Sequence, residues 1–473
     1  MPFGSLFHRG ACVVKWGTWN IQGGEIVQLY SQRSMESPYW NEYLETMPRE
    51  KLDQLHLRRL QHLVGYAYEN VPMYQDLYDK AGVRPGDIRT LDDFREKIPS
   101  IDKPDVVRYQ NQHPPFGDSV VRDSGDYFNF YFQTSGTTGT PLKEIGYYRD
   151  MVTNGWVFKW WAHGIRPRDI IYFAFPFGTF MAFWAAYHSA VALGAQIISS
   201  GGATTEQRVK QIMETKPTVL VATPTYALRI AEVAREMGMD PVGSSIRIVS
   251  SAGEPGYVLP AIRESVEKAW GAKALDLYGL SDLWGCDAWH CPVHPDRLHL
   301  TETVAYGIVL DEEGKLVPEG GQGEWVLTNF VNIMPLIKYR THDVVEWHKE
   351  PCDCGRTWIW LRNGVLGRTD QMVTIKGTNV YPTAIQSITG EINGLTENLE
   401  IHIMTEEGGN AVAVKVEADP KVPAERYEEL RTKLVNDLRY KIGVSIAVEI
   451  LQPRSLPRYE IKAKRVFDHR KKI

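Results

Sequence analysis

Apolar side chains recur along this chain at helical spacing in some stretches and in short unbroken runs in others. In residues 47–66, leucines and a valine return at near-helical intervals among charged residues, which predicts an amphipathic helix. Residues 170–175 form a short apolar run that predicts a buried strand, and residues 181–193 predict a buried helix. Helices and strands are therefore expected to be mixed along the chain.

Strand-like and helix-like runs alternate through the middle of the chain. The expected strands and helices lie, in order, at residues 219–223, 226–237, 246–251 and 258–270. This βαβ rhythm predicts a mostly parallel sheet covered by helices. Ligands of such sheets bind beyond the carboxyl ends of the strands, and the turns at 251–255 and 278–279 fall in that position.

The pattern changes further along the chain. Residues 304–310 and 323–328 alternate between apolar and polar positions, as antiparallel strands do. A strand–helix–strand–strand–helix series follows Gly367. We therefore expect an α/β fold with two domains: residues 1–369, with mostly parallel βαβ sheets and an antiparallel β subdomain, and residues 370–473, a small mobile α+β domain.

Composition and charge narrow the class of protein without identifying it. The chain has 473 residues, of which 43% are hydrophobic and 23% charged, an ordinary composition for a globular protein. A net charge of −5 gives no support for binding nucleic acid or a membrane surface. Residues 170–205 lack Asp, Glu, Lys and Arg, but Pro176, Gly178 and Gly194 interrupt them, so we expect no membrane span there.

The N-terminus and the number of cysteines indicate the cellular compartment in which the protein is expected. The N-terminus lacks the apolar core and cleavage site of a signal peptide. There are five cysteines, and an odd number in a chain of this size argues against a secreted disulfide scaffold. We therefore expect a cytoplasmic protein.

Residues 134–141, Thr-Ser-Gly-Thr-Thr-Gly-Thr-Pro, carry the strongest chemical signal. Glycine permits close backbone approach, and successive free N–H groups and hydroxyls in such a turn can encircle an anion, best of all a phosphate chain. The run follows an aromatic, strand-like stretch at 127–132 and lacks the Gly-Lys-Ser/Thr ending of a Walker loop. The alternative is a flexible Ser/Thr/Gly linker.

The loop resembles the phosphate loop of the adenylate-forming enzymes, which include acyl-CoA synthetases, peptide-synthetase adenylation domains and luciferases. Further segments are similar to that superfamily in the same order, at residues 276–282, 339–343, 367–370, 375–377 and 457–462. Within the superfamily, the amino acids are most similar to the phenylacetate-CoA ligase branch at residues 335–340, 377–382 and 462–468. The resemblance runs from about Tyr39 to the C-terminus.

The resemblance implies that ATP and a carboxylic acid form an acyl-adenylate, from which the thiol of CoA then displaces AMP. The residues expected to hold the outer phosphates are Thr134, Ser135, Gly136, Thr137, Thr138 and Gly139, of which Thr138 is also expected to be catalytic. Family members usually carry a lysine after Gly139, where this chain has Thr140. Lys143 is a candidate for replacing that charge, although it also fits a surface position.

The same resemblance assigns residues to Mg²⁺ and to the nucleoside. Asp282 stands where the family has a glutamate and is the expected Mg²⁺ ligand, because Mg²⁺ prefers carboxylate and phosphate oxygens. Asp343 is expected to accept hydrogen bonds from the two ribose hydroxyls, and Tyr278 to lie beside adenine. The other residues expected to contact the nucleotide are Gly253, Glu254, Pro255, Gly279, Ser281, Arg368 and Lys376.

A mobile lysine completes the implied machinery. Lys462 is expected to neutralise charge that develops at the α-phosphate and the attacking carboxylate. Asp370 would be the pivot that rotates the C-terminal domain between the two half-reactions. Ile461 stands where the family has a glycine, which puts the loop shape in doubt, and Lys464 is the alternative lysine.

A second constellation has the chemistry of a zinc site. Thiolate and imidazole groups suit tetrahedral Zn²⁺, and the candidate ligands are Cys291, His299, Cys352 and Cys354. Some phenylacetate-ligase relatives look similar here, and a closed four-ligand site would be structural. The alternative ligands are Cys286, His290 and His294. Reduced, buried cysteines without metal are the other interpretation.

The acid-binding pocket is the part of the site that the sequence indicates least clearly. The candidates are Phe175, Phe177, Phe180, His188 and Tyr226, in a region where most rings must belong to the core. Aromatic walls favour an aromatic acid of the phenylacetate, benzoate or phthalate type. The alternatives are an adenylating enzyme that passes its acyl group to a carrier-protein thiol and a zinc-dependent binding module without activity. We expect a monomer or homodimer.

Overall fold

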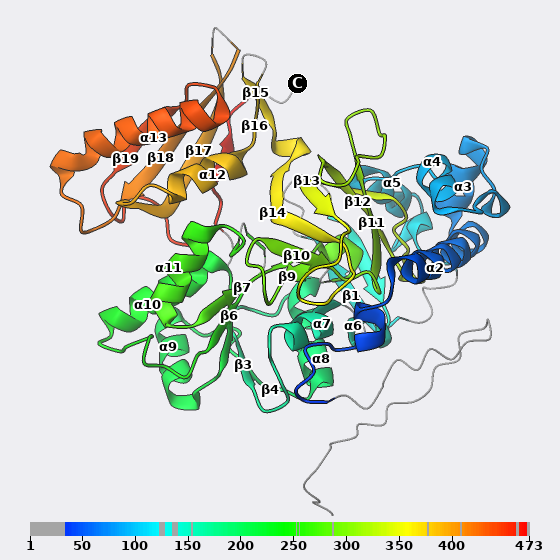
Figure 1. Cartoon of the computed structure of the whole chain (residues 1–473), viewed down its shortest axis with the longest axis horizontal. Helices are drawn as coiled ribbons and strands as arrows, with labels where there is room; N and C mark the ends of the chain where they lie inside the picture. Colours follow the sequence, from blue (N-terminus) through cyan, green and yellow to red (C-terminus); the bar gives the residue numbers. More distant parts are fainter. Residues whose placement is uncertain are drawn as a thin grey trace, which may run out of the picture.

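The computed structural model of the chain shows a large N-terminal part and a smaller C-terminal part, which lies over helices α10 and α11 (Figure 1). The residues described are 34–122, 128–134, 141–152, 155–251, 253–254, 256–285, 288–375, 378–406, 409–459 and 463–470. No helix among these residues is long and apolar enough to cross a membrane. Within this framework, three sheets of more than two strands position the candidate site.

The first of these sheets is parallel throughout, as the βαβ rhythm predicts. Its strands lie in the order β4 (Gln196–Ser199), β3 (Ile170–Phe173), β5 (Val219–Val221), β6 (Ile248–Ser250) and β7 (Lys273–Leu275). The helices that connect them are α8 (Met181–Leu193), α9 (Thr205–Thr215), α10 (Pro224–Glu236) and α11 (Pro260–Trp270). The predicted helix at 181–193 is confirmed with both bounds.

The second sheet confirms the antiparallel expectation. Its seven strands lie in the order β11 (Ala305–Leu310), β12 (Gln322–Asn329), β13 (Tyr339–His348), β14 (Trp360–Arg368), β10 (Arg297–Leu300), β9 (Ala288–His290) and β8 (Leu277–Tyr278). Every neighbouring pair is antiparallel. The strands predicted at 304–310 and 323–328 are β11 and β12, which pair directly.

Short helices and a hairpin precede these sheets. The helices are α1 (Glu42–Glu45), α2 (Arg49–Asn70), α3 (Pro72–Ala81), α4 (Leu91–Lys97), α5 (Lys103–Gln112), α6 (Tyr148–Val152) and α7 (Gly155–Ala162). Strands β1 (Phe130–Gln133) and β2 (Lys143–Gly146) pair antiparallel on either side of the hydroxyl-rich loop. The predicted helix at 47–66 is α2, whose buried face includes Leu52, Leu60, Leu63 and Val64.

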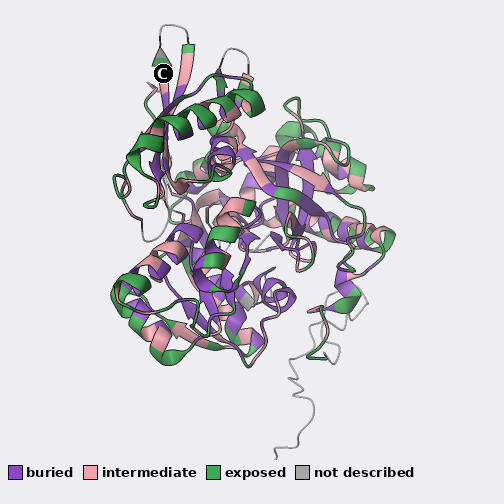
Figure 2. Cartoon of the chain, turned by 60° about the vertical axis from the view of Figure 1, so that its left-hand side comes forward, coloured by how far each residue is buried: buried purple, intermediate pink, exposed green. Residues whose placement is uncertain are grey.

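The C-terminal part has a hydrophobic core of its own, formed by residues between Val373 and Val448. Its elements are β15 (Val373–Ile375), β16 (Thr378–Val380), α12 (Pro382–Gly390), β17 (Leu395–Glu406), β18 (Gly409–Ala418), α13 (Tyr427–Ile442), β19 (Ala447–Leu451) and β20 (Val466–Asp468). The main sheet has the order β19-β18-β17-β20. Figure 2 shows buried residues along its strands and exposed residues on its outer helices. The predicted α/β class with a small α+β part is confirmed.

A buried histidine in α2 gives the fold a pH dependence. His56 is fully buried, and its Nε2 lies 2.8 Å from the carbonyl oxygen of Glu302. Burial lowers the pKa of His56 from 6.5 to about 4, against the raising effect of the Glu302 carboxylate. Because the folded-state pKa is the lower one, stability is present above pH 6.5 and is lost as the pH falls toward 4.

We therefore expect acidification from pH 7 to pH 5 to remove about 2 kcal/mol of unfolding free energy through this one side chain. His56→Gln keeps a donor for the Glu302 carbonyl but does not titrate. Urea unfolding at both pH values should show that the difference in unfolding free energy between wild type and variant decreases by that amount on acidification. Parallel losses in the two proteins would contradict the assignment.

Candidate functional site

The carboxyl ends of the parallel strands bring the predicted site residues toward one edge of the sheet. The segment containing Phe175 follows β3, Thr225 lies just after β5, and Glu254 follows β6. Thr223 caps the start of α10 by accepting a hydrogen bond from the backbone N–H of Tyr226 at 3.3 Å, which fixes the turn that carries Thr225. This edge is where the βαβ pattern places a ligand.

The hydroxyl-rich loop is anchored at its first residue. The backbone N–H of Thr134 donates to the carbonyl oxygen of Leu142, and the N–H of Leu142 donates to Thr134 Oγ1, both at 3.0 Å. Lys103 Nζ, from the first turn of α5, also donates to Thr134 Oγ1 at 2.8 Å. The predicted contacts of Ser135, Gly136, Thr137, Thr138 and Gly139 lie outside the described residues.

The structure points to a different lysine at the loop from the one suggested by the sequence. Lys143 Nζ donates to the carbonyl oxygen of Pro115 at 2.9 Å, so its charge is already engaged at the loop after α5. Lys103 instead lies at Thr134, and its Nζ is 3.8 Å from the carboxylate of Asp282. Sequence reasoning missed Lys103 because it precedes the loop by about thirty residues and stands in an ordinary helix start.

Asp282 lies beside the loop anchor, in the 3₁₀ turn Ser281–Leu283. Its Oδ2 accepts a hydrogen bond from the Tyr339 hydroxyl at 2.6 Å, and the side chain is 13% exposed. The predicted Mg²⁺ ligand and the described end of the phosphate loop are thus linked through Lys103. Gly279 and Ser281 belong to the same turn region, whereas Pro255, Lys376 and Lys462 lie outside the described residues.

Three predicted nucleoside contacts form one hydrogen-bonded group. Asp343 is buried, and its carboxylate accepts from the Tyr278 hydroxyl at 2.6 Å and from Arg368 Nη1 at 2.9 Å. Burial raises the pKa of Asp343, while Arg368 acts to lower it. Arg368 also donates to both carboxylate oxygens of Asp370, at 2.9 and 2.8 Å. The group therefore reaches from β8 to the residue expected to be the pivot.

Glu254 links the N-terminal part to the segment that follows residues 460–462. Its buried carboxylate accepts from Thr225 Oγ1 at 2.7 Å and from the backbone N–H of Ala463 at 2.6 Å. Arg465 Nη1 lies 3.8 Å from the same carboxylate, and Arg465 Nη2 donates to Thr225 Oγ1 at 2.8 Å. Gly253, beside it, adopts a positive φ of 90°. The turn predicted to face adenine thus also holds the C-terminal segment.

Aromatic rings gather after β3 and on α8. Phe175 stacks on Phe183 with ring centroids 3.6 Å apart, and Phe177 and Phe180 lie 5.8 Å from Phe175 and 5.5 Å from Phe183, respectively. His188, on the same helix, packs 5.3 Å from Phe130, 5.5 Å from Tyr148 and 6.2 Å from Trp184. Burial lowers the pKa of His188. Four of the five predicted pocket residues are therefore brought into one region.

Tyr226 does not join that aromatic group. Its ring lies in the separate core cluster between the parallel sheet and its helices. Its hydroxyl lies 3.0 Å from Thr205 Oγ1 and accepts a hydrogen bond from Arg208. The residue is 1% exposed, so we leave it out of the proposed acid pocket.

Four predicted zinc ligands converge at the edge of the antiparallel sheet. The ligand atoms of Cys291, His299, Cys352 and Cys354 all lie within 4.8 Å of one another. Cys354 Sγ is 3.3 Å from His299 Nε2, and Cys291 Sγ is 3.8 Å from Cys352 Sγ. Gly355, with φ of 86°, closes the turn by donating its N–H to the Cys352 carbonyl. Such a cluster of sulfur and imidazole groups fits tetrahedral Zn²⁺.

Two of the alternative ligands are engaged elsewhere. His290 Nδ1 accepts from the N–H of Asp276 at 3.2 Å, and its Nε2 lies 2.7 Å from the Pro295 carbonyl, so both ring nitrogens face backbone groups. His294 Nε2 lies 3.2 Å from the carboxylate of Asp353. Cys286 lies outside the described residues.

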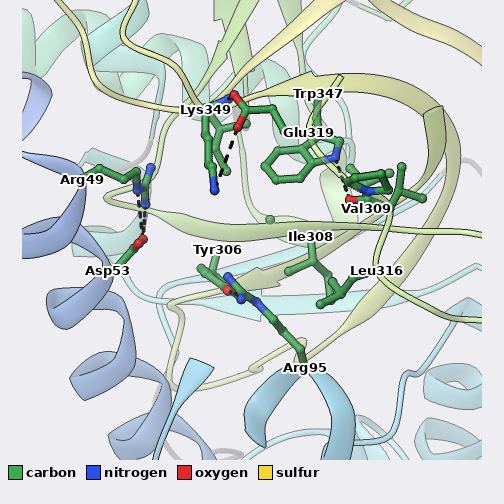
Figure 3. A pocket seen from close by; sticks show the side chains of 14 residues that line it. Arg49, Asp53, Arg95, Tyr306, Ile308, Val309, Leu316, Glu319, Trp347 and Lys349 are labelled. Carbon is green, nitrogen blue, oxygen red and sulfur yellow. Dashed lines mark hydrogen bonds and ion pairs between the residues drawn. The ribbon is translucent and has the colours of Figure 1, made fainter. Parts of the chain in front are cut away.

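A cavity of about 230 Å³ on another face does not belong to this site (Figure 3). None of the predicted site residues lines it. Its charged groups are paired: Arg49 donates to Asp53 at 2.8 Å, Lys349 Nζ lies 3.9 Å from Glu319, and Arg95 pairs with Asp92 at 2.7 Å. The cavity therefore offers no unpaired charge for the anions that the site must hold.

The loop that begins at Thr134 joins β1 to β2, the Asp343 group lies on the antiparallel sheet, and the C-terminal segment docks at the carboxyl ends of β5 and β6. This combination defines an adenylate-forming enzyme. Residues 76–334 match the AMP-binding enzyme family, and residues 377–470 match the AMP-binding enzyme C-terminal domain. The chain is 33% identical to a phenylacetate-coenzyme A ligase of Thermus thermophilus over 90% of this chain and 99% of the relative. The chain therefore belongs to the AMP-binding enzyme family, and within it to the AMP-forming CoA ligases.

Solved structures of 2-hydroxyisobutyryl-CoA ligase show the same fold. One in the postadenylation state, with 2-HIB-AMP, has a TM-score of 0.87 at 30% identity over 93% of this chain and 94% of that chain. Another in the thioesterification state, with 2-HIB-AMP and CoA, has a TM-score of 0.71 at 30% identity over 96% and 97%. The arrangement of this chain is thus closer to the first structure than to the second.

Proposed function

We propose that this CoA ligase activates an aromatic carboxylic acid of the phenylacetate, benzoate or phthalate type with ATP, and then joins it to CoA. The observation that supports the aromatic acid is the group of rings formed by Phe175, Phe177, Phe180 and their neighbours at the edge of the sheet. Flat apolar walls favour a flat apolar ring. The relative named phenylacetate-coenzyme A ligase agrees with this choice.

The nucleotide is proposed to lie along the same edge. Adjacent ribose hydroxyls are donors that one carboxylate can accept, and Asp343 is the buried carboxylate in position. Tyr278 would lie beside adenine, and the loop that begins at Thr134 would surround the outer phosphates. Lys462 would neutralise the charge that develops at the α-phosphate during attack by the acid.

The two half-reactions are proposed to share this site in turn. Formation of the adenylate needs the C-terminal segment close to the nucleotide, and the contact of Ala463 with Glu254 supports that position. Attack by the CoA thiol then needs that segment to leave. We place the boundary between the domains at residues 369–370, where Arg368 bridges Asp343 and Asp370.

Two metal ions are proposed in addition to the substrates. Asp282 would bind Mg²⁺, which draws charge from the phosphates when it is bound. The cluster of Cys291, His299, Cys352 and Cys354 would hold a structural Zn²⁺ that ties β9 and β10 to the turn at 352–356. Its four protein ligands would leave no open position for substrate.

A panel of acids tests the proposal. We expect AMP and pyrophosphate release that depends on both acid and CoA, with kcat/KM for arylacetates or benzoates at least about tenfold above that for 2-hydroxyisobutyrate, because a ring fills the aromatic walls. Thioester formation is followed by mass spectrometry. A preference for the small aliphatic acid would overturn the aromatic assignment, and transfer only to a carrier-protein pantetheine would overturn CoA as acceptor.

A further inference from the structure

One buried carboxylate at the phosphate loop has no partner in the part of the chain that the structure describes. Glu144 lies on β2 with no exposed surface, and neither of its carboxylate oxygens has a hydrogen-bond partner among those residues. Burying a carboxylate without a partner costs several kcal/mol, so the group either remains protonated or awaits a cation. Other buried glutamates of this chain differ: Glu302, for example, pairs with Arg49 at 2.7 Å.

Glu144 lies where the phosphate loop closes. It is two residues after Leu142, the residue that bonds Thr134 through its backbone N–H, so the two side chains point to the same face of the hairpin. Lys103 bonds Thr134 and lies 3.8 Å from Asp282. Phe132, which pairs with Glu144 across the hairpin, packs 6.0 Å from the ring of Trp284, two residues after Asp282. Burial and the charge of Asp282 raise the pKa of Glu144, and the charge of Lys103 opposes them.

We propose that Glu144 and Asp282 together bind the divalent cation that accompanies ATP. This inference rests on the proposed adenylation function. Hard cations such as Mg²⁺ and Mn²⁺ take carboxylate oxygens together with phosphate oxygens, and the two side chains supply the protein's share. Asp282 is one methylene shorter than the glutamate usual in the family, and Glu144 offers a second carboxylate.

The cation also accounts for the charges around the loop. Without it, Lys103 is the positive group near Asp282. Once a divalent cation bridges Glu144 and Asp282, Lys103 has the phosphate oxygens of ATP as acceptors beside Thr134, in a loop that lacks the lysine usual after Gly139. A buried carboxyl group that lacks a partner in the free protein and gains one only with ligand is typical of a binding site.

Glu144→Gln tests the inference without changing the shape of the side chain. We expect the dissociation constant for Mn²⁺, measured by electron paramagnetic resonance in the presence of a non-hydrolysable ATP analogue, to rise at least about tenfold. The Mg²⁺ concentration that half-saturates acid-dependent ATP–pyrophosphate exchange should rise in parallel. The melting temperature of the free variant should stay the same or rise, because a neutral amide replaces a buried carboxyl group that is costly to ionise.

Glu302→Gln is the matched control, a fully buried glutamate that is paired elsewhere. It should lower the melting temperature and leave the affinity for Mn²⁺ unchanged. Equal Mn²⁺ affinity of wild type and Glu144→Gln would overturn the inference. A wild type that binds Mn²⁺ with the analogue but shows no acid-dependent exchange would overturn the proposed function instead, so the two failures are distinguishable.

Discussion

Lys462→Ala is expected to slow acyl-adenylate formation by about 10²–10³-fold, which is typical for removing one group that stabilises developing charge. Attack by CoA on a supplied acyl-adenylate should stay within a few-fold of the wild-type rate. The reason for the split is that, in the proposed reaction, the lysine meets the α-phosphate only in the first half-reaction. It travels with the C-terminal part, whose position must change before the thiol enters.

The residues that follow this lysine contact the N-terminal part. The N–H of Ala463 donates to Glu254 at 2.6 Å, and Arg465 donates to Thr225 at 2.8 Å. These contacts join the C-terminal segment to the carboxyl ends of β5 and β6. The chain directly after Lys462 is therefore held at the carboxyl ends of these strands, where ligands of parallel sheets bind.

Each half-reaction is measured separately. Acid-dependent ATP–pyrophosphate exchange reports adenylation, and thioester yield from synthetic acyl-adenylate reports CoA attack. Lys464→Ala is the matched control, because Lys464 is the next lysine and its Nζ lies 4.8 Å from the ring centre of Phe467, where it faces its own part of the chain. Equal losses of both half-reactions in Lys462→Ala, or a larger loss in Lys464→Ala, would assign the role elsewhere.

The fold was predictable where one local pattern determines one element. The apolar run at 181–193 has no competing interpretation as a strand, and α8 has those bounds. Alternation along 304–310 predicts an antiparallel strand, and β11 is one, but both its faces are buried. Sheet order was not predictable, because β10 pairs with β14 across sixty residues of chain, through contacts that no local pattern encodes.

The candidate site likewise has residues that the sequence predicted and residues that it did not. Tyr278, Asp343 and Arg368 lie on three strands, and motif order alone was enough to group them. Lys103, Glu144 and the docking of Ala463 on Glu254 were missed, because each depends on packing between distant segments. Glu144 gives one signal that reasoning from the sequence did not use: an acidic residue in the short strand directly after the loop.

Loss of the zinc cluster is expected to affect stability more than catalysis. The double variant Cys352→Ser/Cys354→Ser removes two thiolates from four converging ligands, so we expect about one zinc per chain in wild type and none in the variant. Binding of structural zinc contributes folding free energy directly, and its loss should destabilise the chain by several kcal/mol. Elemental analysis and thermal unfolding measure the two effects.

The contacts around the cluster explain why the destabilisation should spread. Arg356, two residues after Cys354, is fully buried and donates to Glu45 at 2.8 Å, and Tyr39 donates to the Cys354 carbonyl at 3.2 Å. The turn at 352–356 therefore anchors α1 and the chain before it to the antiparallel sheet. Cys286→Ser is the control and should keep both the metal and the melting temperature. A metal-free wild type as stable and active as the metal-loaded protein would show that the cluster is four reduced, buried side chains.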